Sequence, residues 1–152
     1  MKKLLSLILA LTVVFSLSAC GLNSIPDGYY EEDEHFDPEG FQDSVDFCIY
    51  KYDSIDKLKK SEYFGRYKCV SEEDIENLKG YYENFEEWMQ TCNRLDEYSF
   101  DTSCISEGDY YRLLTKEGIK LSDGSSYGKY DNYTMYFFDT ETLTLYYIHA
   151  DI

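Results

Sequence analysis

The chain has 152 residues and a formal net charge of −16 at pH 7, with 30 acidic residues against 14 basic ones. This length suits a single domain that can bury a hydrophobic core. The negative charge argues against nucleic acid or an anionic membrane face as a partner. It favours a cationic partner such as Ca²⁺, a basic peptide or a basic protein, although an acidic surface also serves solubility alone.

The N-terminal segment has the pattern of an export signal. The basic start MKK precedes an uncharged apolar run, residues 4–19, that is shorter than the ~20 residues a bilayer-spanning helix needs. The tetrapeptide LSAC, residues 17–20, resembles the lipobox of bacterial lipoproteins, such as the small lipoproteins of Gram-positive envelopes. The alternative is an ordinary secretory signal with a chance cysteine.

The lipobox resemblance implies a cleaved leader and a lipid anchor. Residues 1–19 would be the signal peptide, and Cys20 would become the lipidated N-terminus of the mature protein. Two acyl chains are enough for stable membrane attachment. The resemblance therefore implies an exported protein that is anchored to the outer face of the bacterial cell membrane.

Residues 20–40 are predicted to be the lipidated cysteine and an acidic tether. Residues 27–39 hold seven acidic residues and no Lys or Arg, and Pro and Gly interrupt any regular pattern. Like charges extend such a segment. The motif EEDEHFD, residues 31–37, lacks the spacing and the glycine of a calcium loop, so neither a metal nor any other cofactor is predicted.

Residues 41–152 are predicted to form a single α+β domain that begins with short elements. Residues 45–52 alternate as a strand, residues 54–62 suit one short helix, and residues 64–70 are predicted to form a second strand.

The segment 72–92 carries the clearest helix signals. Ser71 and Asp74 form a capping box, and Val70 and Ile75 occupy the positions of a hydrophobic staple. Apolar residues then recur at steps of three and four, which predicts one buried helix face. Its members are Ile75, Leu78, Tyr82, Phe85, Met89 and Cys92. Gly80 should cost ~1 kcal/mol relative to Ala, and Asn93 is the predicted C-terminal stop.

The rest of the chain is rich in β-branched and aromatic residues. Strands are predicted at residues 98–105, 109–116, 133–138 and 143–149, with a polar loop at 122–132. The predicted fold is one long helix packed on an antiparallel sheet that ends in a C-terminal β-hairpin. This element order resembles cystatin-like and nuclear-transport-factor-like folds, and it implies no function.

The predicted C-terminal hairpin is apolar on both faces. A turn at residues 139–142 would pair Phe138 with Leu143, and the helix would then cover the face of Leu143 and Leu145. The opposite face needs a second cover, which a neighbouring segment, a second copy or a bound ligand can supply. If it stays open, it is a candidate aromatic binding face for a peptide or glycan. Its central residues are Tyr133, Met135, Phe137 and Tyr146.

One pattern resembles a hydrolase motif but lacks its context. The sequence GSSYG matches G-x-S-x-G with Ser126 as the nucleophile, and Asp131 or Asp139 and then His149 follow in hydrolase order. The nucleophile elbow needs a strand before it and a helix after it, whereas a strand is predicted to follow here. His149 with Asp151 offers only two metal ligands. No catalytic residue or metal ligand is predicted.

The sequence leaves the oxidation state of the cysteines beyond Cys20 open. Cys48, Cys69, Cys92 and Cys104 could form the sequence-local disulfides Cys48–Cys69 and Cys92–Cys104, since export permits oxidation. They could equally remain as reduced, buried thiols.

The sequence thus favours a lipid-anchored cell-envelope protein with a non-enzymatic binding or interaction domain. The alternative is an inhibitor or immunity-type lipoprotein that neutralises a basic partner. A hydrolase that uses Ser126 is the third hypothesis.

Overall fold

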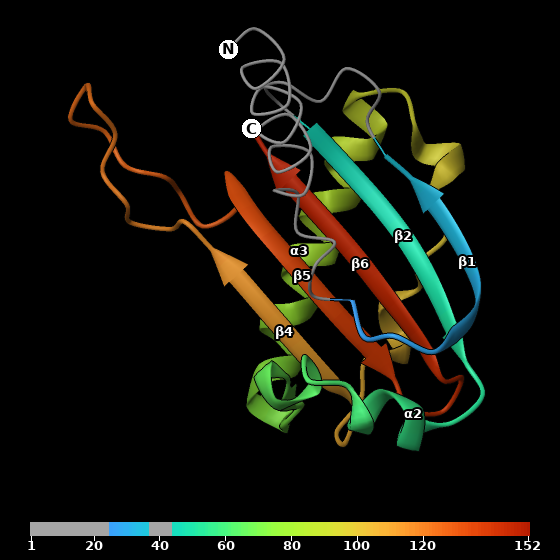
Figure 1. The fold of residues 1–152 in the computed structure, drawn as a ribbon. Coiled ribbons are helices and arrows are strands. Elements are labelled where there is room, and N and C mark those ends of the chain that lie inside the picture. The colour runs from blue at the N-terminus through green and yellow to red at the C-terminus, as the bar shows by residue number, and fades with distance from the viewer. Residues whose placement is uncertain (1–24, 37–43) are drawn as a thin grey trace, which may run out of the picture.

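The structure is a computed structural model that describes residues 25–36 and 44–152. A six-stranded antiparallel sheet carries one long helix, α3, across one face, and a short helix, α2, covers one end of the other face (Figure 1). The predicted α+β class, the single long helix and the C-terminal hairpin are all confirmed.

The strands lie in the order β1-β2-β6-β5-β4-β3. Their bounds are Tyr29–His35 (β1), Ser44–Tyr52 (β2), Lys68–Cys69 (β3), Tyr110–Thr115 (β4), Asn132–Asp139 (β5) and Thr144–Asp151 (β6). The helices are Ile55–Lys60 (α2) and Glu72–Thr91 (α3). Short 3-10 turns occupy Phe64–Arg66, Leu95–Glu97 and Thr102–Cys104.

Helix α3 begins and ends as its sequence predicts. The Ser71 N–H donates to Asp74 Oδ2 at 3.0 Å, and the Ser71 hydroxyl reaches the same oxygen at 2.7 Å. At the other end Asn93 adopts a left-handed φ of 56°, and the Arg94 N–H donates back to the Met89 carbonyl at 2.8 Å. This is the hydrogen-bond pattern of a Schellman motif.

The buried face of α3 differs from its prediction at three positions, one of which is Ile75, which is only partly buried. Leu78, Tyr81, Tyr82, Phe85 and Met89 are buried, so Tyr81 joins the predicted stripe. The prediction for Cys92 is wrong: its side chain is exposed because the helix ends at Thr91 and the chain turns away there.

The C-terminal hairpin is shifted by two residues from its predicted register. Phe138 pairs with Leu145 and Asp139 with Thr144, so the loop runs from Thr140 to Leu143. The carboxylate of Asp139 accepts hydrogen bonds from the Glu141 N–H at 2.8 Å and the Thr142 hydroxyl at 2.7 Å. These bonds keep Asp139 in the strand and move the turn beyond it.

Helix α3 covers the hairpin face that was predicted to need another cover. Tyr133, Met135, Phe137 and Ile148 share a core with its buried side chains. Leu145 and Tyr147 point to the opposite face, where Leu58 of α2 packs against them. The prediction that α3 lies on the Leu145 face is therefore wrong, although the grouping of alternate residues into two faces is confirmed.

Three segments differ from their predictions more strongly. Residues 29–35, within the predicted tether, form β1 and pair with β2, so the domain begins before residue 41. Residues 98–105, predicted as a strand, contain only a 3-10 turn at Thr102–Cys104, because Phe100 stacks on Tyr82 with ring centroids 3.8 Å apart and does not join the sheet. The predicted strand at 64–70 is reduced to β3.

Candidate functional site

One edge of the sheet is only partly occupied. β3 pairs with Tyr110 and Tyr111 of β4 and ends there, whereas β5 pairs with all of β4. Among the described residues, no strand lies against the outer side of β4 from Arg112 to Thr115.

The backbone groups at this edge can be assigned by alternation. The Lys116 N–H donates to the Asn132 carbonyl at 3.1 Å, so the even-numbered residues of this strand bond to β5. Leu113 and Thr115 therefore direct their N–H and C=O groups outward, away from β5. Unpaired groups of this kind are a template for an additional strand.

A groove of about 360 Å³ runs along the open edge. It is lined by Arg66, Lys68, Asn77, Tyr111, Arg112, Leu113, Leu114 and Thr115. The 3-10 turn after α2, strand β3, helix α3 and strand β4 each contribute to this lining. We call it the β4 groove.

The β4 groove is basic although the protein carries a net charge of −16. Its lining includes Arg66, Lys68 and Arg112, and it includes no Asp or Glu. The Arg112 guanidinium lies over the Tyr136 ring, 5.6 Å from its centroid. Stacking of this kind leaves the edge of a guanidinium free to bind a carboxylate with two parallel hydrogen bonds.

Two buried polar atoms near this groove have no hydrogen-bond partner. They are Nη1 of Arg112 and the hydroxyl of Tyr67. Burial raises the pKa of Tyr67 well above its ordinary value, and the positive charge of Arg112 acts in the opposite direction. Unpaired buried donors are costly, and neither atom is open to solvent, so both lie out of reach of a ligand in the groove.

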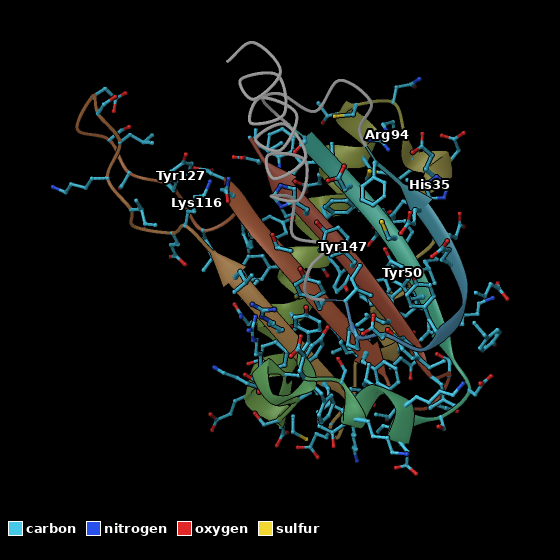
Figure 2. All side chains as sticks on the ribbon, in the orientation of Figure 1. His35, Tyr50, Arg94, Lys116, Tyr127 and Tyr147 are labelled. Atoms are coloured by element: carbon cyan, nitrogen blue, oxygen red, sulfur yellow. The ribbon has the colours of Figure 1, made fainter. Side chains whose placement is uncertain are left out.

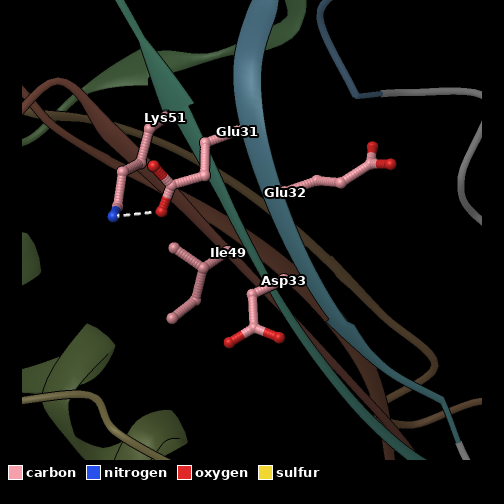
Figure 3. A pocket seen from close by; sticks show the side chains of 5 residues that line it. All are labelled: Glu31, Glu32, Asp33, Ile49 and Lys51. Carbon is pink, nitrogen blue, oxygen red and sulfur yellow. Dashed lines mark hydrogen bonds and ion pairs between the residues drawn. The ribbon is translucent and has the colours of Figure 1, made fainter.

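The opposite edge of the sheet is acidic. Figure 3 shows Glu31 and Asp33 of β1 on the same side as Ile49, with Glu32 on the other side. These four residues and Lys51 line a hollow of about 70 Å³. Lys51 pairs with Glu31 there. No group of three or more His, Cys, Asp or Glu among the described residues could hold a metal ion. Charged residues on an edge strand oppose pairing between sheets.

The serine motif lies on a loop that extends away from the sheet between β4 and β5 (Figure 1). Ser126 forms an isolated bridge with Lys120, with neither a strand before it nor a helix after it. Where this loop leaves the sheet, Lys116 Nζ lies 5.5 Å from the ring centroid of Tyr127, and the two side chains are neighbours in Figure 2.

The proposed partners of Ser126 have other contacts. His149 Nδ1 lies 2.9 Å from Thr134 Oγ1 and 3.1 Å from the Tyr133 carbonyl oxygen. Asp131 accepts a hydrogen bond from the Gly128 N–H at 2.6 Å, and Asp139 holds the hairpin turn. The geometry needed for acyl transfer is not assembled from these residues.

His149 and Asp151 are likewise in separate contacts. Asp151 accepts a hydrogen bond from the Asn132 amide and lies 3.9 Å from Lys116 Nζ. The pair that the sequence offered as metal ligands is therefore occupied by protein groups.

The candidate aromatic binding face is not a surface. Tyr133, Met135 and Phe137 are buried under α3, and Tyr146 is partly buried against Phe100, with ring centroids 4.7 Å apart. Of the alternatives for this face, the structure shows internal cover, and the cover is α3 rather than the short N-terminal elements. The alternative of an open face at these four residues is wrong.

The cysteines of the described residues are all free thiols. Cys48 is buried, Cys104 is partly buried, and Cys69 and Cys92 are exposed. Burial raises the pKa of the Cys48 thiol to about 12. The structure shows neither of the two predicted disulfides, and Cys20 lies outside the described residues together with the leader.

No protein-family model, curated protein or solved structure matches this chain. Of the helices that the structure describes, none is both long and apolar enough to cross a membrane.

Proposed function

We propose that this chain is an exported, lipid-anchored protein of the bacterial cell envelope whose α+β domain binds a partner without catalysing a reaction. The observation that supports this proposal is the β4 groove, a basic concave site beside an open strand edge on a strongly acidic protein. Export and the anchor at Cys20 rest on the lipobox resemblance alone.

The anchor can be tested by partitioning between detergent and water. The protein expressed in a bacterial host should enter the detergent phase, and a Cys20→Ala variant should leave it or retain its leader. Equal partitioning of the two proteins would remove the anchor from the proposal.

The binding function can be tested by cross-linking in the intact envelope. We expect the Arg66→Gln/Lys68→Gln variant to lose the captured partner. The matched control is Lys60→Gln/Lys120→Gln, which removes the same charge from exposed positions outside the groove. If both variants capture the partner equally, the β4 groove is not the binding site.

The acidic edge supports a second candidate function. Glu31, Glu32, Asp33 and Glu34 follow one another on the outermost strand, which suits an inhibitor or immunity-type protein that neutralises a basic partner. Capture of a basic protein that is lost in high salt and in a Glu32→Gln/Asp33→Asn variant would favour this candidate over the first.

A further inference from the structure

We propose that the occupant of the β4 groove is an extended peptide segment of another protein, which adds a strand to the sheet and places a carboxylate against Arg112. This inference rests on the proposed binding function and names its ligand class.

The geometry of the edge favours a strand over a compact ligand. β3 already pairs antiparallel with Tyr110 and Tyr111, and the groove begins where β3 ends. A strand laid against the rest of β4 would meet the outward N–H and C=O groups of Leu113 and Thr115. Peptide recognition by strand addition takes its affinity from such main-chain bonds and its specificity from pockets for alternate side chains.

Side chains of β4 are available to contact the added strand on both faces of the sheet. Tyr110 belongs to the core on the α2 side of the sheet, and Tyr111 to the core under α3. Alternation therefore places Arg112 and Leu114 on the α2 side, and Leu113 on the α3 side. Leu114 is 44% exposed, which leaves apolar area for a ligand side chain to cover.

Charge selects the side chain that the ligand must carry. The basic lining favours a carboxylate, which can accept two hydrogen bonds from one guanidinium. The overall charge of −16 repels a strongly acidic partner. The ligand is therefore a segment with a single acidic residue among apolar ones, rather than an acidic run.

The same repulsion argues against a second copy as the occupant. The acidic strand β1 complements the β4 groove locally, but two copies bring together the full negative charge of both molecules. A second copy is accordingly one of the outcomes that the test must separate.

The test measures peptide binding to the full-length chain in detergent micelles by fluorescence anisotropy. The probe is a labelled pool of blocked peptides with one central glutamate among alternating valine and threonine. The matched pool carries glutamine in its place. We expect the glutamate pool to bind about tenfold more tightly, as the loss of a charge-assisted hydrogen bond predicts.

Backbone methylation separates strand addition from simple charge attraction. Successive N–H groups of a bound peptide strand point alternately toward β4 and away from it. Methylation of a peptide nitrogen that faces β4 should therefore abolish binding, whereas methylation of the next nitrogen should leave binding unchanged. Equal effects at both residues would overturn strand addition. Displacement of the peptides by inorganic phosphate at micromolar concentration would identify a small-anion site instead.

Variants of the protein test whether the peptide binds in the β4 groove. Arg112→Gln should weaken binding of the glutamate pool severalfold and leave binding of the glutamine pool unchanged, while Lys60→Gln should change neither. Binding of the glutamine pool shows that the Arg112→Gln variant is folded. Concentration-dependent dimers that Arg112→Gln dissolves would assign the groove to a second copy. If no peptide binds while envelope cross-linking still captures a partner, this inference fails and the proposed function stands.

Discussion

Asp74 joins the start of α3 to the sheet. One carboxylate oxygen accepts from the backbone N–H and the hydroxyl of Ser71, and the other accepts from the Tyr111 hydroxyl at 2.9 Å. These bonds, led by the Ser71 side chain, hold the pKa of Asp74 below its ordinary value of 3.8. Burial and the same hydrogen bond raise the pKa of Tyr111 to about 12.

The lowered pKa of Asp74 predicts a pH-dependent contribution to stability. A carboxyl group whose pKa is lower in the folded than in the unfolded state contributes its full stabilisation of the fold at pH values above the unfolded-state pKa. That contribution is lost as the pH falls through the folded-state pKa. Asp74→Asn should therefore cost ~1 kcal/mol at pH 7. Urea unfolding should show this difference shrinking as the pH falls below 3.8. A gap that stays constant into acid would mean that the carboxylate charge does not contribute.

The Tyr130 hydroxyl occupies the space that a side chain at position 80 of α3 would need, which accounts for a glycine within this helix. A Cβ atom at position 80 would lie 2.8 Å from the Tyr130 hydroxyl oxygen, whereas the next nearest atom, Cζ of the same ring, is 3.8 Å away. Removing the hydroxyl would therefore open the space that an alanine needs. The sequence shows the helix penalty of this glycine, but it does not show which side chain approaches it.

A double-mutant cycle tests this account of Gly80. In a Tyr130→Phe background, Gly80→Ala should stabilise by ~1 kcal/mol, the usual helix preference of alanine over glycine. In the wild-type background the clash should cancel that gain or reverse it. Thermal or urea unfolding of the four proteins measures the coupling. An equal gain in both backgrounds would show that the Tyr130 hydroxyl moves away freely.

At the scale of elements, Phe85 is the central anchor of α3. It is fully buried, with its ring centroid 5.7 Å from that of Tyr98 and 6.5 Å from that of Phe47 on β2. Phe85→Ala should cost ~3–5 kcal/mol in the free energy of unfolding. Glu83→Ala and Glu86→Ala, at exposed positions of the same helix, should change it by no more than ~0.5 kcal/mol. Similar losses at all three positions would contradict the observed orientation of the helix.

Elements that carry their own local signals were predictable from the sequence. Helix α3 has a cap, an apolar stripe and a left-handed stop, and each of these depends on residues within a few positions of one another. β1 has no such signal, because its residues YYEEDEH are almost all exposed and read as an acidic coil. Its strand conformation comes from β2, the next element in the chain, which supplies the hydrogen-bond ladder.

The strand prediction for residues 98–105 is wrong for a related reason. Its composition favours a strand, but β6 already pairs with β2 and β5 on both sides, and residues 98–105 pack on α3 instead. In the helix-side core, Tyr98 contacts Phe47 and Phe85, and Phe100 contacts Tyr82 and Phe137. Tertiary packing overrides strand propensity at this position.

At the scale of the whole molecule, the sheet has two edges of opposite charge. β1 presents consecutive acids, and the β4 groove presents Arg66, Lys68 and Arg112. The three basic residues come from two separate segments, which the pairing of β3 with β4 brings together. The sequence could not place them in one site, because that pairing is non-local and β3 has only two residues.

The strand order also places the N-terminal boundary of the folded domain before residue 29. β1 provides the outer neighbour of β2, and Glu34 accepts a hydrogen bond from the Tyr50 hydroxyl at 2.6 Å. The hydroxyl of Tyr52 donates to the Pro26 carbonyl, also at 2.6 Å. Burial raises the pKa of both tyrosines, so each hydroxyl needs its acceptor where little water reaches it.

A pair of truncations tests this boundary. A chain that begins at residue 25 should unfold with the stability of the full-length protein, whereas a chain that begins at residue 41 should lose several kcal/mol. The loss follows because the truncation uncovers the rings of Tyr50 and Tyr52, which Ile25 and Tyr29 cover in the folded domain, at ~25 cal/mol for each Å² of apolar surface exposed. The exposed edge of β2 also adds a site for aggregation. Urea unfolding and light scattering measure the two effects. A Glu31→Gln/Glu32→Gln variant of the longer chain controls for lost charge, since it keeps β1 and should stay near wild-type stability. Equal stability of the two truncated chains would contradict this boundary. Residues 25–40 would then be a tether, and β2 would be the edge strand of the sheet.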